Sequence, residues 1–190
     1  MYVTDGFRIY GNAELDSCLI ARLFRDTPRN PNGGFGNNKP GTCTPVDVCK
    51  EITLSGYTDK VYQCRVSNSF AGSRAYCKQL DASADLYWAE STAEWATFQA
   101  AVQAGTIAGN AWLGYTDEAT TRPDGNGPWL AVSGFTGYDP TAEPNFWEPG
   151  EPNGGNNENF IQLYGNGHAN DLPGGNELSA LCRVPSPSVH

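Results

Sequence analysis

The stretch STAEWATFQAAVQAGTIAGNAWLGYTDE, from Ser91 to Glu118, carries the strongest secondary-structure signals of the chain. Its first half predicts an amphipathic helix, because large apolar side chains recur three and four residues apart. These side chains are Trp95, Phe98 and Val102. Ser91 or Thr92 can cap the start of this helix, and Glu94 stands at capping-box distance from Ser91. The second half, NAWLGYTDE, predicts a strand that ends in a turn.

Further elements flank this stretch on both sides. Before it, DKVYQCRV predicts a strand, SNSFAGSRAYCKQLDA predicts a helix capped by Ser67 or Ser69, and ADLYWAES predicts a short strand. After it, ENFIQLYG and LSALCRV predict two closing strands. The chain from Asp117 to Asn159 is mostly loop, and a loop of that length is expected to be functional or disordered. Its spaced aromatic residues predict a packed loop; they are Trp129, Phe135, Tyr138, Phe146 and Trp147.

The two ends of the chain have weaker signals. We expect residues 1–56 to form a disulfide-stapled extension, with GFRIYG and SCLIARLF as short strands in it. Residues 186–190 are expected to be a frayed tail. The opening MYVTDGFRIY lacks the basic-then-apolar pattern of a signal peptide, so Met1 is expected to start a shortened chain.

Composition limits the classes of partner. The chain has 190 residues, 39% of them hydrophobic, and a net charge of −9. This acidic balance argues against nucleic acid as a partner, because phosphate binding needs basic stripes. It is compatible with neutral ligands and with cations. No apolar run approaches the ~20 residues of a membrane span.

Six cysteines and only two histidines indicate disulfides in an oxidising compartment. No two of the cysteines have CxxC spacing, so a zinc site is not favoured. Six reduced, buried thiols are the alternative interpretation. Disulfides predict a secreted or cell-surface protein.

One polar stretch, EPGEPNGGNNENF from Glu148 to Phe160, is rich in oxygen-bearing side chains, glycine and proline. Read alone, it fits an ordinary acidic surface loop. Asn170 and Asp171 follow at a workable spacing, and together the oxygen donors predict a site for a hard cation such as Ca²⁺.

Several motifs occur in the order found in the C-type lectin-like domain family. They are SRAYC, TAEWATFQAAV, WLGYTD, NFWEPGEPN, ENFIQL, NDLP and LSALC. The chain resembles this family over about residues 57–185. The resemblance implies an α+β, C-type lectin-like fold with two helices, small antiparallel sheets and a long irregular ligand-binding loop.

The resemblance also implies a disulfide between Cys77 and Cys182. The other four cysteines, Cys18, Cys43, Cys49 and Cys64, allow three connectivities. An extra N-terminal disulfide in longer family members favours Cys18–Cys64 with Cys43–Cys49. Two departures concern the ligand site: Phe160 and a residue near Pro173 stand where the family has a bracing disulfide, and Ala169 replaces a tryptophan.

The same resemblance assigns five side chains to one Ca²⁺: Glu151, Asn153, Glu158, Asn170 and Asp171. Sugar binding is assigned to Glu151, Asn153, Glu158 and Asn170. In the family, Glu-Pro-Asn accompanies mannose, glucose, N-acetylglucosamine or fucose, and its Glu-Pro bond is cis. Asp117 and Glu118 resemble part of an auxiliary calcium site, in which Thr121 does not match.

The resulting prediction is a calcium-dependent carbohydrate-binding protein, not an enzyme, and its oligomeric state stays open. One rival is a glycosidase that uses Glu151 and Glu158. The other is a lectin-like domain that binds protein or ice.

Overall fold

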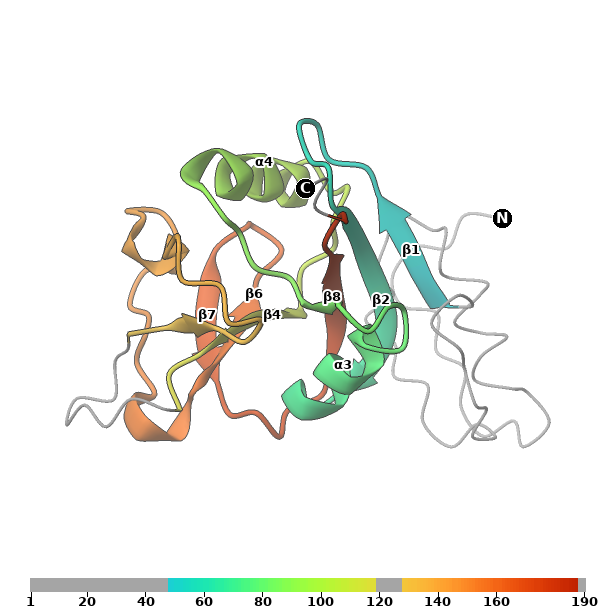
Figure 1. Cartoon of the computed structure of the whole chain (residues 1–190). Helices are drawn as coiled ribbons and strands as arrows, with labels where there is room; N and C mark the ends of the chain where they lie inside the picture. The colour runs from blue at the N-terminus through green and yellow to red at the C-terminus, as the bar shows by residue number, and fades with distance from the viewer. Residues whose placement is uncertain (1–47, 119–127, 188–190) are drawn as a thin grey trace, which may run out of the picture.

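The computed structural model describes residues 48–118 and 128–187, which build one mixed sheet covered by two helices (Figure 1). The strand order is β1-β2-β8-β4-β6-β7, and β3 pairs with β8 while β5 pairs with β4. The strands are β1 (Cys49–Ile52), β2 (Lys60–Asn68), β3 (Asp85–Leu86), β4 (Ala111–Thr116), β5 (Leu130–Ala131), β6 (Phe160–Leu163), β7 (Ala169–Leu172) and β8 (Leu178–Val184). The helices are α3 (Phe70–Cys77) and α4 (Thr92–Gln103), with 3-10 turns η1 (Pro140–Ala142) and η2 (Gly155–Asn157).

The predicted α+β class is confirmed, but the strands join in one sheet instead of several small ones. All pairings are antiparallel among the described strands except that of β4 with β8. Three strands, β1, β5 and β7, were not predicted. The segment ANDL of β7 is polar and lies between turn-forming residues, so no apolar alternation marks it as a strand.

Helix α4 begins and packs as its sequence predicts. Ser91 is its cap, and the Ser91 hydroxyl accepts the Glu94 backbone N–H at 3.2 Å. Only this half of the capping box forms, because the Glu94 carboxylate accepts the Glu90 N–H and also contacts Arg183. The three apolar side chains of the predicted face are buried. Helix α3 is shorter than predicted and is capped by Ser69.

Each face of the sheet carries its own hydrophobic core. Side chains alternate along β4, so Leu113 joins the core beneath α4 while the neighbouring Trp112 joins the core beside α3. The same alternation separates Leu181 from Cys182 in β8. The sheet is therefore held between the two helices, as Figure 1 shows from the side.

The disulfide between Cys77 and Cys182 is present, with the two Cα atoms 5.4 Å apart, and ties α3 to β8. The predicted pairs Cys18–Cys64 and Cys43–Cys49 are wrong, because Cys49 is bonded to Cys64. These two residues face each other across the β1–β2 pairing, which brings their side chains together. Cys18 and Cys43 lie outside the described residues, as do the strands expected near the N-terminus.

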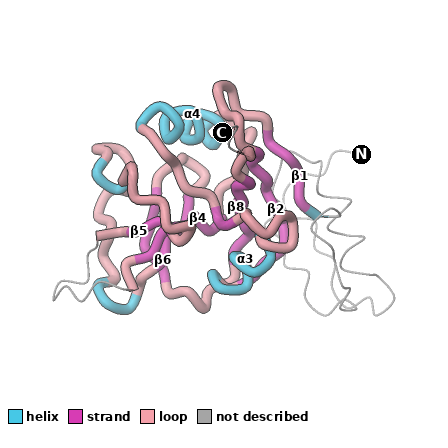
Figure 2. The backbone as a smooth tube through the Cα atoms, viewed as in Figure 1, coloured by secondary structure: helices cyan, strands magenta, loops and turns pink. Residues whose placement is uncertain are grey.

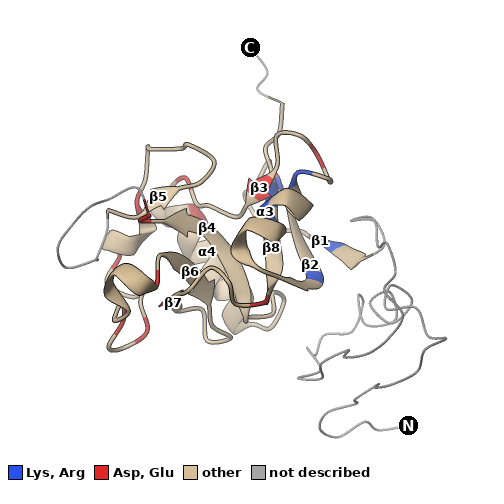
Figure 3. Ribbon diagram, turned by 90° about the horizontal axis from the view of Figure 1, so that it is seen from below, with Lys and Arg blue, Asp and Glu red and all other residues tan. Residues whose placement is uncertain are grey.

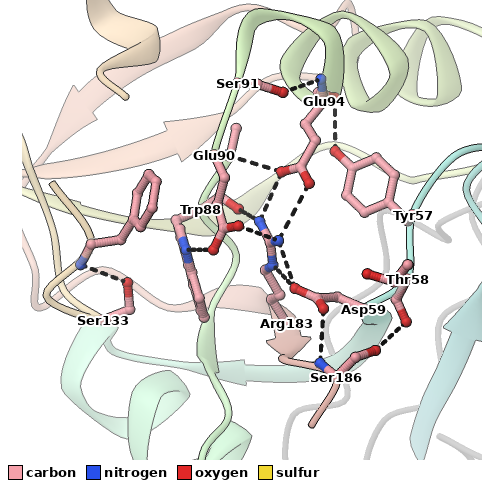
Figure 4. A network of polar contacts seen from close by, with 12 residues as sticks. Tyr57, Thr58, Asp59, Trp88, Glu90, Ser91, Glu94, Ser133, Arg183 and Ser186 are labelled. Carbon is pink, nitrogen blue, oxygen red and sulfur yellow. Dashed lines mark hydrogen bonds and ion pairs between the residues drawn. The ribbon is translucent and has the colours of Figure 1, made fainter. Parts of the chain in front are cut away.

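Arg183 joins β8 to α4 and to the start of β2 (Figure 4). Its side chain is 2% exposed and meets Asp59 at 2.6 Å, Glu94 at 2.9 Å and Glu90 at 3.3 Å. The guanidinium also lies over the Trp88 ring, 5.0 Å from its centroid. These carboxylates raise the pKa of Arg183 against the effect of burial. The network therefore ties together three segments that are far apart in the sequence.

Of the residues between β4 and β6, those from 128 to 159 have little regular structure (Figure 2). They are nevertheless packed, as their aromatic residues predict. Trp129 and Phe146 are buried in the core beneath α4, and Phe135, Tyr138 and Trp147 pack against it. Within residues 48–118 and 128–187, no helix has the length and apolar character needed to cross a membrane.

Candidate functional site

The polar loop from Glu148 to Glu158 is fastened to β7 by backbone hydrogen bonds. The Ala169 N–H donates to the Phe146 carbonyl at 2.7 Å, and the Glu148 N–H donates to the Ala169 carbonyl at 2.9 Å. Ala169 is fully buried at this junction. Ala169 thus joins the loop to the sheet through its backbone.

An aromatic contact holds Phe160 at the start of the β6–β7 hairpin. A Cβ atom on Gly174 would lie 2.5 Å from the Phe160 ring, so only glycine lets the ring pack there. The Phe160 ring also packs on Phe70, with ring centroids 4.3 Å apart. The Phe70 N–H donates to the Gly174 carbonyl at 2.9 Å. The β6–β7 hairpin is therefore braced by packing and hydrogen bonding instead of a covalent bond.

Asp171 brings the polar loop and β7 together. It is 1% exposed, and its two carboxylate oxygens accept the backbone N–H groups of Asn153 at 3.0 Å and Gly154 at 2.9 Å. Asn153 itself is exposed. The structure thus brings the Glu-Pro-Asn tripeptide against Asp171, which lies 18 residues further along the chain.

Glu151 and Glu158 flank the turn of this loop. The Glu151–Pro152 peptide bond is cis, as the resemblance predicts. The Glu151 Oε2 atom is buried and has no hydrogen-bond partner within residues 48–118 and 128–187. Glu158 folds back over Gly154, where a Cβ atom would lie 2.2 Å from its carboxylate. Glycine at this position leaves room for the Glu158 side chain.

The carboxylates of the loop repel one another. Burial raises the pKa of Glu151 to about 7, and so do its contact with Asp171 and the negative charges of Asp171 and Glu158. Burial and Asp171 likewise raise the pKa of Glu158. A bound cation would relieve this repulsion, because it favours the charged form of each group.

The sequence around these groups supplies no lysine or arginine to neutralise them. Residues 128–182 contain no Lys or Arg but seven Asp or Glu. Figure 3 shows the described basic residues near α3, β1 and β2, away from the loops beyond β5 and β7. This end of the domain is therefore negatively charged, which favours a cation as ligand.

Asn170 is 7% exposed and lies beside Asp171 in β7. Its Nδ2 atom donates to Oε1 of Gln162 at 3.2 Å, and Gln162 Nε2 donates to Oδ1 of Asn110 at 2.7 Å. Gln162 and Asn110 were not predicted as site residues. The register of β6 against β7 places Gln162 opposite Asn170, and a side-chain hydrogen bond joins Asn110 to Gln162. Tyr164 was not predicted either, and its pKa is raised by burial and then by nearby carboxylates, including Glu151.

The donor set fits calcium better than zinc. Within the described residues, no three His, Cys, Asp or Glu side chains converge closely enough to form a metal centre by themselves. This holds also for Glu151, Glu158 and Asp171, so an ion bound here would take amide carbonyl oxygens as well, which Ca²⁺ accepts in proteins. The unpartnered Glu151 oxygen and the raised carboxyl pKa values are consistent with such an ion.

The remaining residues singled out in the sequence have simpler surroundings. Trp147 packs between Trp129 and Phe146, with centroid distances of 5.3 and 5.0 Å, as expected for a core residue. Asp117 is buried and Glu118 is exposed, and Thr121 lies outside the described residues.

Comparison with solved structures identifies the fold. A scan against family models and a search of curated proteins find no match. Human lithostathine aligns with a TM-score of 0.56 and 22% identity over 73% of this chain and 91% of its own. The cow C-type carbohydrate-recognition domain of CD23, solved in the presence of an oligosaccharide, aligns with a TM-score of 0.52 and 21% identity over 72% of this chain and 98% of its own.

A calcium-independent type II antifreeze protein aligns with a TM-score of 0.51 and 17% identity, over 73% of this chain and 98% of its own. The chain therefore has the C-type lectin-like fold. Because proteins of different function share that fold, the function must be argued from the site.

Proposed function

We propose that this protein binds carbohydrate through a calcium ion and recognises vicinal hydroxyls of the mannose, fucose and glucose type. One observation carries the proposal. The Glu151-Pro152-Asn153 tripeptide folds onto Asp171, where a buried Glu151 oxygen has no hydrogen-bond partner among the described residues. Burial, and then the nearby Asp171 and Glu158 carboxylates, raise the pKa of Glu151.

Five side chains would hold the ion: Glu151, Asn153, Glu158, Asn170 and Asp171. All of them offer oxygen donors, and calcium takes 6–8 of these. When bound, the ion supplies a Lewis-acidic point that accepts lone pairs from two adjacent sugar hydroxyls. Asp171 orients the loop through its two backbone hydrogen bonds.

Four of these residues would also form hydrogen bonds with the sugar hydroxyls. A hydroxyl donates its proton to a carboxylate and accepts from an amide N–H. Glu151 and Glu158 provide the carboxylates, and Asn153 and Asn170 provide the amides. The Glu-Pro-Asn order sets which side of the sugar meets an acceptor and which meets a donor.

We propose binding without catalysis, in an extracellular setting. Glu151 and Glu158 sit on one short loop next to Asp171, and the pKa of each is raised first by burial and then by the Asp171 carboxylate. A glycosidase needs its acid and nucleophile on two sides of a groove. The buried disulfide between Cys77 and Cys182 fits an oxidising compartment.

The test exchanges the donor and acceptor sides of the site. The double variant Glu151→Gln with Asn153→Asp keeps the number of oxygen donors and the total charge, so calcium binding should survive. Mannose and fucose should then meet an amide where they need a carboxylate. Each mismatched polar contact costs about 1–3 kcal/mol, which should abolish a weak monosaccharide complex.

Calorimetric titration of calcium, followed by mannose, fucose and galactose, gives the readout. Asp171→Asn is the matched control. Its amide oxygen still accepts a backbone N–H from the loop, but the side chain no longer offers a negative charge to the metal ion. This variant should lose calcium and sugar together. An unchanged sugar ranking in the double variant, or a wild type that prefers galactose, contradicts the proposed coordination.

A further inference from the structure

A chain of three amides runs behind the proposed site. Gln162 is 7% exposed and lies in β6, with Asn170 of β7 as its cross-strand partner. Gln162 Oε1 accepts from Asn170 Nδ2 at 3.2 Å, and Gln162 Nε2 donates to Asn110 Oδ1 at 2.7 Å. The chain thus leads from the start of β4, through β6, to the proposed calcium ligand.

The direction of these hydrogen bonds decides which end of Asn170 is free. A primary amide has a carbonyl on one branch and an NH2 group on the other. Because Gln162 offers Asn170 an acceptor, Asn170 turns its NH2 group towards Gln162, and its carbonyl is the opposite branch. If Gln162 were turned over, it would donate to the Asn170 carbonyl and leave the NH2 group to the site, which repels a cation.

Asn110 sets the orientation of Gln162, and its own backbone is held by two neighbouring strands. Its N–H donates to the Leu163 carbonyl at 2.7 Å, and its carbonyl accepts the Ser179 hydroxyl at 3.1 Å. Asn110 also has a φ of +63°, in the left-handed region that asparagine tolerates. The chain of three amides therefore ends on an acceptor, Asn110 Oδ1, whose backbone is held in place.

We infer that Gln162 is a positioning residue that turns the Asn170 carbonyl towards the bound calcium. One N–H of Asn170 is used by Gln162, and the second is left for a sugar hydroxyl. The inference rests on the proposed function, and it adds two residues, Gln162 and Asn110, that touch neither metal nor sugar.

The first experiment compares calcium affinity by calorimetry in two variants of Gln162. Gln162→Met removes both hydrogen bonds at similar volume and should weaken calcium binding tenfold or more, as losses behind a metal ligand commonly do. Gln162→Glu can still accept from Asn170, so it should bind calcium at least as well as the wild type.

Gln63 offers a matched control for the loss of a buried amide. It is 4% exposed in β2, and its side chain donates to the Ala108 carbonyl at 2.9 Å and accepts the Ala108 N–H at 3.1 Å. Gln63→Met should lower the melting temperature while leaving the calcium affinity unchanged.

A second pair of variants changes Asn110, the exposed end of the chain of three amides, where a substitution puts folding at little risk. Asn110→Gly suits the positive φ but removes the acceptor, so Gln162 is free to turn and calcium binding should weaken at least threefold. Asn110→Asp keeps the acceptor and should retain wild-type affinity.

The outcomes separate the two proposals. If the wild type binds calcium and both Gln162→Met and Asn110→Gly bind it equally well, the amides are structural only and the inference is overturned, while the proposed function stands. If the wild type binds no calcium, the proposed function is overturned and the inference with it.

Discussion

Replacing Glu151 by Gln should stabilise the calcium-free protein at neutral pH. The folded-state pKa of Glu151 is about 7 instead of its ordinary 4.5, first because of burial and then because of Asp171 and Glu158. A carboxyl group whose pKa rises on folding contributes its full stability below pH 4.5, and that contribution is lost as the pH rises through about 7. Without screening by solvent, this rise in the pKa corresponds to about 3 kcal/mol of the free energy of unfolding. Because Glu151 is only partly buried, we expect about 1 kcal/mol at pH 8.

The assay is thermal unfolding in chelator at pH 5 and pH 8. A difference of about 1 kcal/mol moves the melting temperature of a chain of this size by about 2–4 °C. Glu151→Gln should melt higher than the wild type at pH 8 and close to it at pH 5, where the wild-type carboxyl is mostly protonated. Excess calcium should reverse the order, because a ligand at a hundredfold excess over its Kd adds about 2.7 kcal/mol to the wild type. A variant that melts lower than the wild type at both pH values would refute the reasoning.

Two further predictions concern the frame that holds the site. Replacing Cys77 and Cys182 by Ala removes a disulfide that joins residues 105 apart in the sequence. Replacing Cys49 and Cys64 by Ala removes one that joins residues 15 apart. Chain entropy predicts losses of about 5 and about 3 kcal/mol, and urea unfolding that ranks the pairs in the opposite order would count against this estimate. Arg183→Met leaves Asp59 and Glu94 without their partner and should cost about 3–5 kcal/mol. Lys60→Met, in an exposed pair with Glu51, should cost less than about 1 kcal/mol in the same urea assay, and equal losses would contradict the role of the network.

The parts of the fold that sequence predicts are those set by local pattern. The apolar spacing and serine cap of α4 depend on neighbours within the helix, and both are observed. The Cys49–Cys64 bond could not be derived in this way, because it depends on β1 pairing with β2 at the edge of the sheet. Strand β7 was missed for a related reason, since Ala169 to Leu172 form a strand only through their pairing with β6.

The same distinction between local pattern and long-range pairing applies to the residues of the candidate site. Glu151, Asn153 and Glu158 belong to one conspicuous loop, and the motif order that links them to Asn170 and Asp171 can be read from the sequence. The hydrogen bonds from Asn153 and Gly154 to Asp171 agree with that grouping. Gln162 could not be found, because a polar residue in a strand normally faces solvent, and only the β6–β7 register shows it buried against Asn170.

Retention of the protein on immobilised mannan tests the central claim most directly. The full chain, with its disulfides intact, is applied in millimolar calcium and then washed with chelator at the same pH and ionic strength. We predict that it is retained in calcium, released by chelator, and released by free mannose or fucose but not by galactose. Passage through the column in calcium, or retention that persists in chelator, would contradict a calcium-dependent carbohydrate site at Glu151 and Asn153.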